Sequence, residues 1–152
     1  MVNNGKKFEE IIKRDFSALE GAKITRLYDP VGGYKAIKNV CDFIGYCYPY
    51  SFYFEAKTTK GNTFNFSSLT QYEKLLDYAH TKGLYAGVLI WFYEHNKIVW
   101  CSIARIEWLK DFGVKSININ HPSSYDFVVD CEIKKKYPKI DFKDFYNKIS
   151  KD

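Results

Sequence analysis

The sequence predicts an α/β fold in which helices cover a mixed β-sheet. In some segments apolar residues recur every three or four positions, as in amphipathic helices, and short β-branched and aromatic runs separate these segments. One such run, residues 86–92, contains no polar side chain, as in a strand that is covered on both faces. The predicted order of elements is α-β-β-β-α-β, continued by a further strand, a helix and a C-terminal tail.

The first element is a helix that ends near Gly21, because glycine is a frequent stop signal at the end of a helix. The apolar stripe of this helix consists of Phe8, Ile11, Ile12, Phe16 and Leu19. Residues 24–28 are partly β-branched and are closed by the Asp-Pro pair at residues 29–30, so they predict a short strand. The loop that follows carries Gly32, Gly33, Lys35 and Lys38.

The next two strands are predicted to form an antiparallel hairpin. Residues 42–46 and 51–57 are rich in aromatic residues and alternate in hydropathy, and the turn falls at residues 48–50. A hairpin that is symmetric about this turn places Asp42 directly opposite Glu55. Residues that face each other in this way point to the same side of the sheet.

A second helix is predicted over residues 68–82. Ser68 and Gln71 have the spacing of a capping box, in which Gln71 is the third helical residue and returns to the backbone of Ser68. The helical stripe that follows consists of Leu69, Tyr72, Leu75, Leu76 and Ala79. Gly83 is the stop signal.

The centre of the sheet is expected in the apolar run at residues 86–92. A turn at residues 94–97 leads from this run to a partner strand at residues 98–101. Two more helices are predicted, at residues 103–112 and 142–149. The connection between these helices contains Lys134, Lys135 and Lys136.

The composition is that of one ordinary globular domain, and we expect a single domain over residues 1–152. Hydrophobic residues make up 46% and charged residues 27%, which excludes collagen-like, solenoid and disordered chains. The net charge of +5 favours a polyanionic partner without requiring one. The longest apolar run, residues 84–93, is about half the ~20 residues of a membrane-spanning helix. No signal peptide pattern begins the chain, so we expect a cytoplasmic protein without a membrane partner.

The four cysteines are expected to be small buried side chains. They show no C-x-x-C pairing, and the three histidines lie far from them without the spacing of metal ligands. A structural zinc site is therefore not expected.

The best candidate site is formed by Asp42, Glu55 and Lys57. The period of two in a strand puts Glu55 and Lys57 on one face, which we expect to be polar, and Phe54 on the opposite face, toward the core. Asp42 and Glu55 would then lie side by side, and two neighbouring carboxylates repel each other unless a positive charge lies between them.

A divalent metal ion would relieve this repulsion. The two carboxylates and the nearby Ala56 carbonyl offer hard oxygen ligands, which suit Mg²⁺ or Mn²⁺ rather than zinc. The metal and the Lys57 ammonium would both offset the negative charge that develops during phosphodiester hydrolysis. The same residues also fit a solvated strand face on which Glu55 and Lys57 form an ion pair.

Five short motifs follow one another along nearly the whole chain. They are the segment NNGKKFE at residues 3–9, Asp42, FEAK at residues 54–57, TQY at residues 70–72 and YPKIDF at residues 137–142. In type and spacing these motifs resemble the PD-(D/E)XK nucleases, and in particular the RecU-like Holliday junction resolvases. Tyr53, where cellular relatives often carry an acid, and a short segment before Asp42 favour a compact member of the kind that phages encode.

The resemblance implies a restriction-endonuclease-like core and a metal-dependent endodeoxyribonuclease. The implied activity is symmetric cleavage of four-way junctions in DNA recombination and repair, by a homodimer that binds branched DNA and uses Mg²⁺ or Mn²⁺. The catalytic residues that it implies are Glu9, Asp42, Glu55, Lys57 and Gln71, with Asp42 and Glu55 as the metal ligands. We also expect four basic residues to contact DNA phosphates, namely Arg26, Lys35, Lys38 and Lys60.

Alternatives remain open for individual residues and for the function. Glu9 is also placed to form an ordinary helical ion pair with Lys13, four positions later. The capping box with Ser68 explains Gln71 structurally, while the resemblance also places it near the attacking water, and both roles are compatible. Two other functions are alternatives to a Holliday junction resolvase. One is a PD-(D/E)XK nuclease of the restriction or repair type, and the other is a module that binds branched DNA without cutting it.

Overall fold

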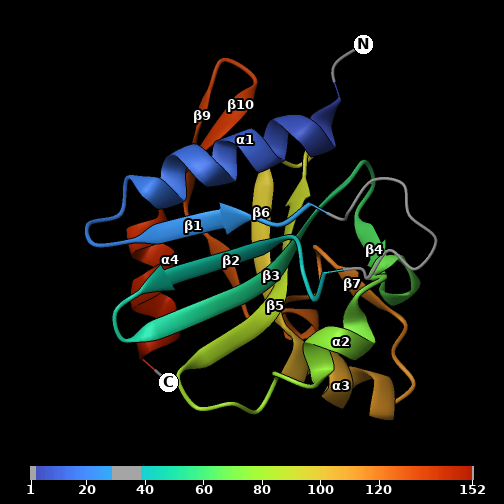
Figure 1. Cartoon of the computed structure of the whole chain (residues 1–152). Helices are drawn as coiled ribbons and strands as arrows, with labels where there is room; N and C mark the ends of the chain where they lie inside the picture. The colour runs from blue at the N-terminus through green and yellow to red at the C-terminus, as the bar shows by residue number, and fades with distance from the viewer. Residues whose placement is uncertain (1–2, 29–38, 152) are drawn as a thin grey trace, which may run out of the picture.

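The computed structural model describes residues 3–28 and 39–151, which form a six-stranded mixed β-sheet with helices on both faces (Figure 1). The strand order is β1-β2-β3-β5-β6-β8. The predicted α/β class with a mixed sheet is therefore confirmed. The loop at residues 29–38, with Lys35 and Lys38, lies outside the described residues.

The N-terminal helix packs its apolar stripe against the sheet, as predicted. Helix α1 spans Asn4–Ser17. Asn3 is its N-cap, and the Asn3 side chain accepts a hydrogen bond from the Lys6 backbone N–H. Such a cap satisfies one of the helix's free N–H groups. Strand β1, Lys23–Arg26, follows and pairs antiparallel with β2, Phe43–Cys47, at one edge of the sheet.

The predicted hairpin has the predicted register. Strand β2 pairs antiparallel with β3, Tyr50–Thr59, and Phe43 lies opposite Phe54 while Cys47 lies opposite Tyr50. Strand β3 also pairs in parallel with β5, Leu84–Phe92. Strand β6, Lys97–Ser102, then pairs antiparallel with β5 through the predicted turn. The hairpin and the central strand therefore follow the sequence pattern closely.

Five short strands were not predicted, because segments of three or four residues are too short to show a hydropathy period. Strand β8, Phe127–Val129, is the sixth strand of the sheet, and β4, Thr63–Asn65, pairs with β7, Ser116–Asn118. Strands β9, Cys131–Lys134, and β10, Tyr137–Ile140, form a separate hairpin. The lysine triplet at residues 134–136 thus occupies a hairpin tip.

The prediction of a long helix over residues 68–82 is wrong. The segment begins with a 3₁₀ turn, η1, Phe66–Ser68, and helix α2 covers only Tyr72–Leu76. Gln71 precedes this helix without a side-chain cap, so the capping box does not form. Its side chain instead reaches the backbone of a distant segment, and this tertiary contact outweighs the local helical signal.

The remaining helices are close to their predicted bounds. Helix α3 spans Ile103–Asp111 and helix α4 spans Phe142–Ser150, and a short 3₁₀ turn, η2, covers Pro122–Ser124. Three cysteines are buried and Cys131 is half-buried, all as free thiols, as expected. In the described part of the chain, no helix is long and apolar enough to cross a membrane.

Both faces of the sheet carry an apolar core. Helices α1 and α4 cover one face, with Phe8, Phe16, Phe52 and Phe54 in its core, while α2 and α3 cover the other (Figure 1). The expectation that Glu55 lies on a polar face is therefore wrong. Its neighbours on that face include buried apolar side chains of β5 and β6, because both sides of a central strand are covered in this fold.

Candidate active site

Asp42 is held in place by the backbone of two neighbouring strands. It lies just before β2, where its carbonyl accepts a hydrogen bond of 2.7 Å from the Leu27 N–H. Its carboxylate Oδ2 accepts one of 3.1 Å from the Ala56 N–H of β3. Both contacts are with backbone groups, so the carboxylate is fixed beside β3 independently of any flexible side chain.

Glu55 brings a second carboxylate to the same place. The β2–β3 register, continued by one residue, sets Glu55 opposite Asp42. The Glu55 side chain is buried, and its Oε2 atom has no hydrogen-bond partner among the described residues. A buried carboxylate oxygen without a donor is costly, so this atom is a candidate ligand for a cation.

The protonation of both carboxyls reflects this burial. Desolvation raises the pKa of Glu55 to about 7, and the charge of Asp42 adds to the rise while Lys57 and the Gln71 N–H oppose it. Desolvation also raises the pKa of Asp42, against the Ala56 hydrogen bond and the charges of Arg26 and Lys57. The two carboxylates therefore repel each other in a poorly hydrated site.

These residues fit a divalent cation. A metal ion would give the Glu55 Oε2 atom a partner and would offset both negative charges. Within residues 3–28 and 39–151, no group of three His, Cys, Asp or Glu side chains is placed to hold a metal. The two carboxylates would be the protein ligands, and water would complete a shell of the kind that Mg²⁺ prefers.

Arg26 links Glu9 to Asp42. Its Nε and Nη2 atoms lie 3.0 and 3.1 Å from the two carboxylate oxygens of Glu9. Its Nη1 atom donates to the Asp42 carbonyl at 3.2 Å and lies 3.8 Å from the Asp42 Oδ1. Glu9 therefore pairs with Arg26, and Arg26 faces carboxylates at the site, where the sequence predicted a phosphate contact.

Gln71 connects the site to the segment that enters it. Its Nε2 atom donates a hydrogen bond of 2.7 Å to the carbonyl of Asn39, three residues before Asp42. Its Oε1 atom is buried and has no partner among the described residues. The structure thus brings Gln71 to the site by a route other than the predicted capping box.

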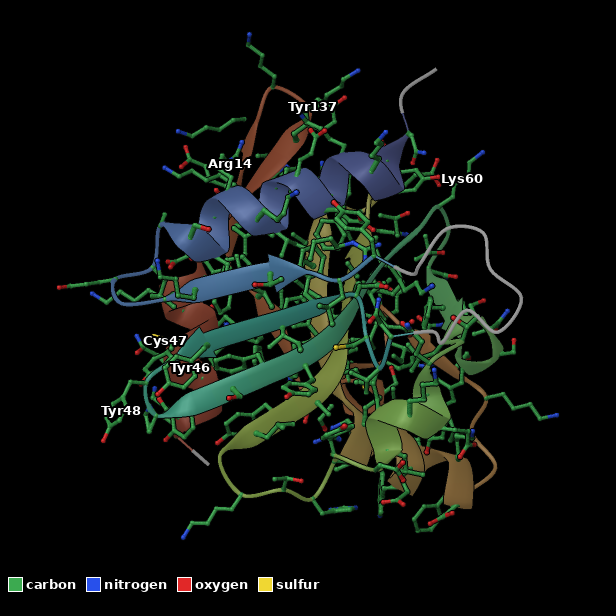
Figure 2. All side chains as sticks on the ribbon, in the orientation of Figure 1. Arg14, Tyr46, Cys47, Tyr48, Lys60 and Tyr137 are labelled. Atoms are coloured by element: carbon green, nitrogen blue, oxygen red, sulfur yellow. The ribbon has the colours of Figure 1, made fainter. Side chains whose placement is uncertain are left out.

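The two remaining predicted residues lie on or just after β3. Lys57 is half-buried, lies on the same face as Glu55 and lowers the pKa of both carboxyls. Lys60 follows the strand and projects outward at the edge of the molecule (Figure 2). Glu9, Arg26, Asp42, Glu55, Lys57 and Gln71 are therefore gathered at one end of the β1–β3 ribbon.

Sequence reasoning missed the bridge that Arg26 forms. The signal was present in the register, because Arg26 lies opposite Phe43, the residue next to Asp42. A strand running from residue 23 to residue 26 beside the hairpin would have placed an arginine next to the predicted carboxylates. The pairing of β1 with β2 was not part of the prediction, so the proximity of Arg26 to the carboxylates was missed.

Comparisons with known proteins give one family and a structural similarity. The family model described as recombination protein U, RecU, matches residues 22–148, which include Asp42, Glu55, Lys57 and Gln71 and begin after Glu9. A solved structure of Hjc, a Holliday junction resolvase from the archaeal hyperthermophile Archaeoglobus fulgidus, aligns with a TM-score of 0.48 at 19% identity. The alignment covers 66% of this chain and 78% of that one. No curated protein matches the chain.

Proposed function

The chain belongs to the recombination protein U family, and we propose from this premise that its Asp42–Glu55 site is the catalytic centre of a Mg²⁺-dependent enzyme. The family assigns the chain the activity of a Holliday junction resolvase, an endonuclease that acts on branched DNA. Resolvases of this kind depend on metal ions. What we propose is the ion, the residues and their roles.

The observation that carries the proposal is the buried Oε2 atom of Glu55, which has no hydrogen-bond partner among the described residues and lies beside Asp42. The protein buries Glu55 beside an apolar core, at a cost to its stability, and provides no donor for its Oε2 atom. Asp42 and Glu55 would together hold the ion. When bound, Mg²⁺ supplies an electrophile for the phosphodiester and lowers the pKa of water.

The other side chains have roles that follow from their charges. Lys57 presents a positive charge beside the carboxylates, where it would orient the nucleophile and offset the charge on the reacting phosphate. Arg26 holds the Asp42 backbone and is itself held by Glu9, so this pair acts as a positioning unit. Gln71 fixes the segment before Asp42 through its hydrogen bond to the Asn39 carbonyl, and its Oε1 atom can accept a hydrogen bond from a donor such as water.

Three basic residues would bind the DNA backbone. Lys35, Lys38 and Lys60 are the proposed phosphate contacts, and the net charge of +5 supports such a role. Cutting a four-way junction symmetrically requires two equivalent sites, so we propose a homodimer in which each copy, one nuclease domain over residues 1–152, supplies one site. Because the substrate is DNA, we also propose a cytoplasmic location.

The proposal is tested by cleavage of a labelled four-way junction beside a linear duplex and a flap of matched sequence. Wild type and Asp42→Asn are each assayed with Mg²⁺ and with EDTA. We expect paired nicks at symmetric positions in the junction, and their loss in EDTA and in the variant, which should still bind the junction.

The other outcomes identify the rival functions. Comparable cutting of the linear duplex would indicate a general nuclease of the restriction or repair type. Tight junction binding without cutting at any metal concentration would indicate an architectural module. Full activity of Asp42→Asn would show that the catalytic centre lies elsewhere.

A further inference from the structure

The β9–β10 hairpin carries a cluster of positive charge that the proposed catalytic centre does not use. The hairpin projects past α1 at the edge of the molecule (Figure 1). Its tip consists of Lys134, Lys135 and Lys136, which are all exposed. Among the described residues, none of these three lysines forms an ion pair, and the Lys136 ammonium lies 5.4 Å from the centre of the Tyr137 ring. No carboxylate in the described part of the chain neutralises the tip, so its positive charge is available to an anionic partner.

The hairpin is firmly mounted on α1. The buried Asp15 of α1 accepts a hydrogen bond of 2.8 Å from the Ile140 N–H at the base of the hairpin. Near the tip, the Lys7 ammonium of α1 lies 4.7 Å from the centre of the Tyr137 ring (Figure 2). Contacts at both ends hold the hairpin in place, so the tip lysines are presented by a rigid element with little entropy to lose on binding.

The tip has a backbone conformation that disfavours lysine. Lys135 has a φ of 61°, in the left-handed region where glycine or asparagine is normally found. A two-residue turn joins the paired residues Lys134 and Tyr137. A lysine where glycine would be more stable indicates that the side chain is retained for something other than folding.

The hairpin and the catalytic centre flank the same turn of α1. Lys7, which contacts the hairpin, and Glu9, which pairs with Arg26 at the site, are two residues apart in α1. At 3.6 residues per turn they lie at nearly the same height on opposite flanks of the helix. A duplex that leaves the site across this turn of α1 therefore reaches the lysine tip.

We propose that the lysine tip of the β9–β10 hairpin is a second docking point for DNA, which binds the phosphate backbone of a duplex arm next to the cleavage site. The inference rests on the proposed function for its choice of partner. Because the tip would contact only backbone charge, it should hold the arm of a junction and an isolated duplex equally well.

The test compares two triple variants with the same loss of charge. Lys134, Lys135 and Lys136 are replaced by alanine in one, and in the other the exposed Lys82, Lys143 and Lys151, on other parts of the surface, are replaced. Binding of a labelled four-way junction and of a linear duplex is measured in EDTA over a range of salt. Cleavage is measured with Mg²⁺ at saturating junction.

We expect the hairpin variant to bind both DNAs roughly tenfold more weakly. The slope of its log affinity against log salt concentration should fall by the amount that about two to three phosphate contacts contribute. Its kcat at saturating junction should equal that of wild type, and the control variant should change little. Equal losses in the two variants would show a general charge effect and overturn the proposal. An unchanged affinity of the hairpin variant would overturn it too, as would a loss confined to the junction.

A single substitution separates binding from folding at the tip. Glycine adopts a φ of 61° without strain, so Lys135→Gly should raise the urea midpoint of unfolding and yet weaken DNA binding about threefold. Unchanged binding by this variant would assign Lys135 no role in docking. If wild type binds DNA and never cuts it, the proposed function fails, and the affinities still decide the role of the hairpin.

Discussion

Phe54 and Glu55 are neighbours on β3 and are equally buried, at 1% exposure each, on opposite faces of the sheet. Phe54 stacks on Phe43 with ring centres 5.4 Å apart and meets the edge of Trp100 at 6.1 Å. Glu55 lies beside another carboxylate and leaves one oxygen without a partner. Burial therefore stabilises the fold at Phe54 and destabilises it at Glu55.

Phe54 is therefore explained by folding, whereas folding alone does not explain Glu55. An apolar side chain at position 55 would stabilise the protein, since the surrounding face is itself an apolar core. We propose that the acid at that position is kept to bind a cation in the folded protein. The following predictions test this contrast, from the largest expected effect to the smallest.

Glu55→Gln should lower junction cleavage by about three orders of magnitude or more, because the neutral amide neither attracts the metal nor replaces the lost charge. Junction affinity in EDTA should stay close to that of wild type. Tyr53→Phe, on the same face of β3 two residues earlier, is the control and should cut normally. Residual cleavage by Glu55→Gln within tenfold of wild type would remove Glu55 from the catalytic centre.

Phe54→Ala should destabilise the fold by about 3–5 kcal/mol, because it removes a buried ring that contacts Phe43 and Trp100. Urea unfolding followed by tryptophan fluorescence measures this change. Phe54→Leu, which keeps most of the volume, should cost less than about 2 kcal/mol. Equal costs for the two variants would mean that ring packing does not stabilise this face.

Glu55→Gln should make the metal-free protein more stable, and increasingly so as the pH rises from 4.5 to about 7. The raised pKa of Glu55 means that the folded protein keeps a proton that the unfolded chain releases above its ordinary value of 4.5. Wild type therefore loses stability through this pH window, up to about 3 kcal/mol, and the variant does not. Urea unfolding in EDTA at pH 5 and pH 8 measures the difference in the free energy of unfolding between Glu55→Gln and wild type. An equal difference at both pH values would contradict the raised pKa of Glu55.

Glu9→Gln and Arg26→Gln should each lower cleavage, by roughly ten- to a hundredfold, and the double variant should lose little more than either one alone. The two residues form one hydrogen-bonded unit, so the effects of breaking it are not additive. Rates at saturating junction complete the double-mutant cycle. Independent, multiplicative losses would show that Glu9 acts on the reaction without Arg26.

The sequence could predict the carboxylate pair because its geometry depends on a local element. A short turn and two alternating strands determine the β2–β3 register, and the register alone brings Asp42 opposite Glu55. The central strand β5 and the helices α1, α3 and α4 likewise carry long, clear patterns.

Local sequence patterns could not predict the contacts between distant segments. The Arg26–Glu9 pair joins a helix to an edge strand, and the Gln71–Asn39 hydrogen bond joins residues 32 positions apart. The Gln71–Asn39 hydrogen bond accounts for the error at residues 68–82. The apolar stripe predicts a long helix there, and the structure has a turn followed by a five-residue helix. Tertiary contacts decide such segments more than local propensity does.

The measurement that tests the central claim most directly is calorimetric titration of Mn²⁺ into wild type and Glu55→Gln at pH 8, without DNA. If the buried carboxylate is retained for a cation, wild type binds the ion and the variant, although more stable, binds it far more weakly. The binding by wild type should also weaken as the pH falls below about 7, where Glu55 takes up a proton. Equal binding by the two proteins would contradict the account, since Glu55 would then be buried without a role in holding the metal.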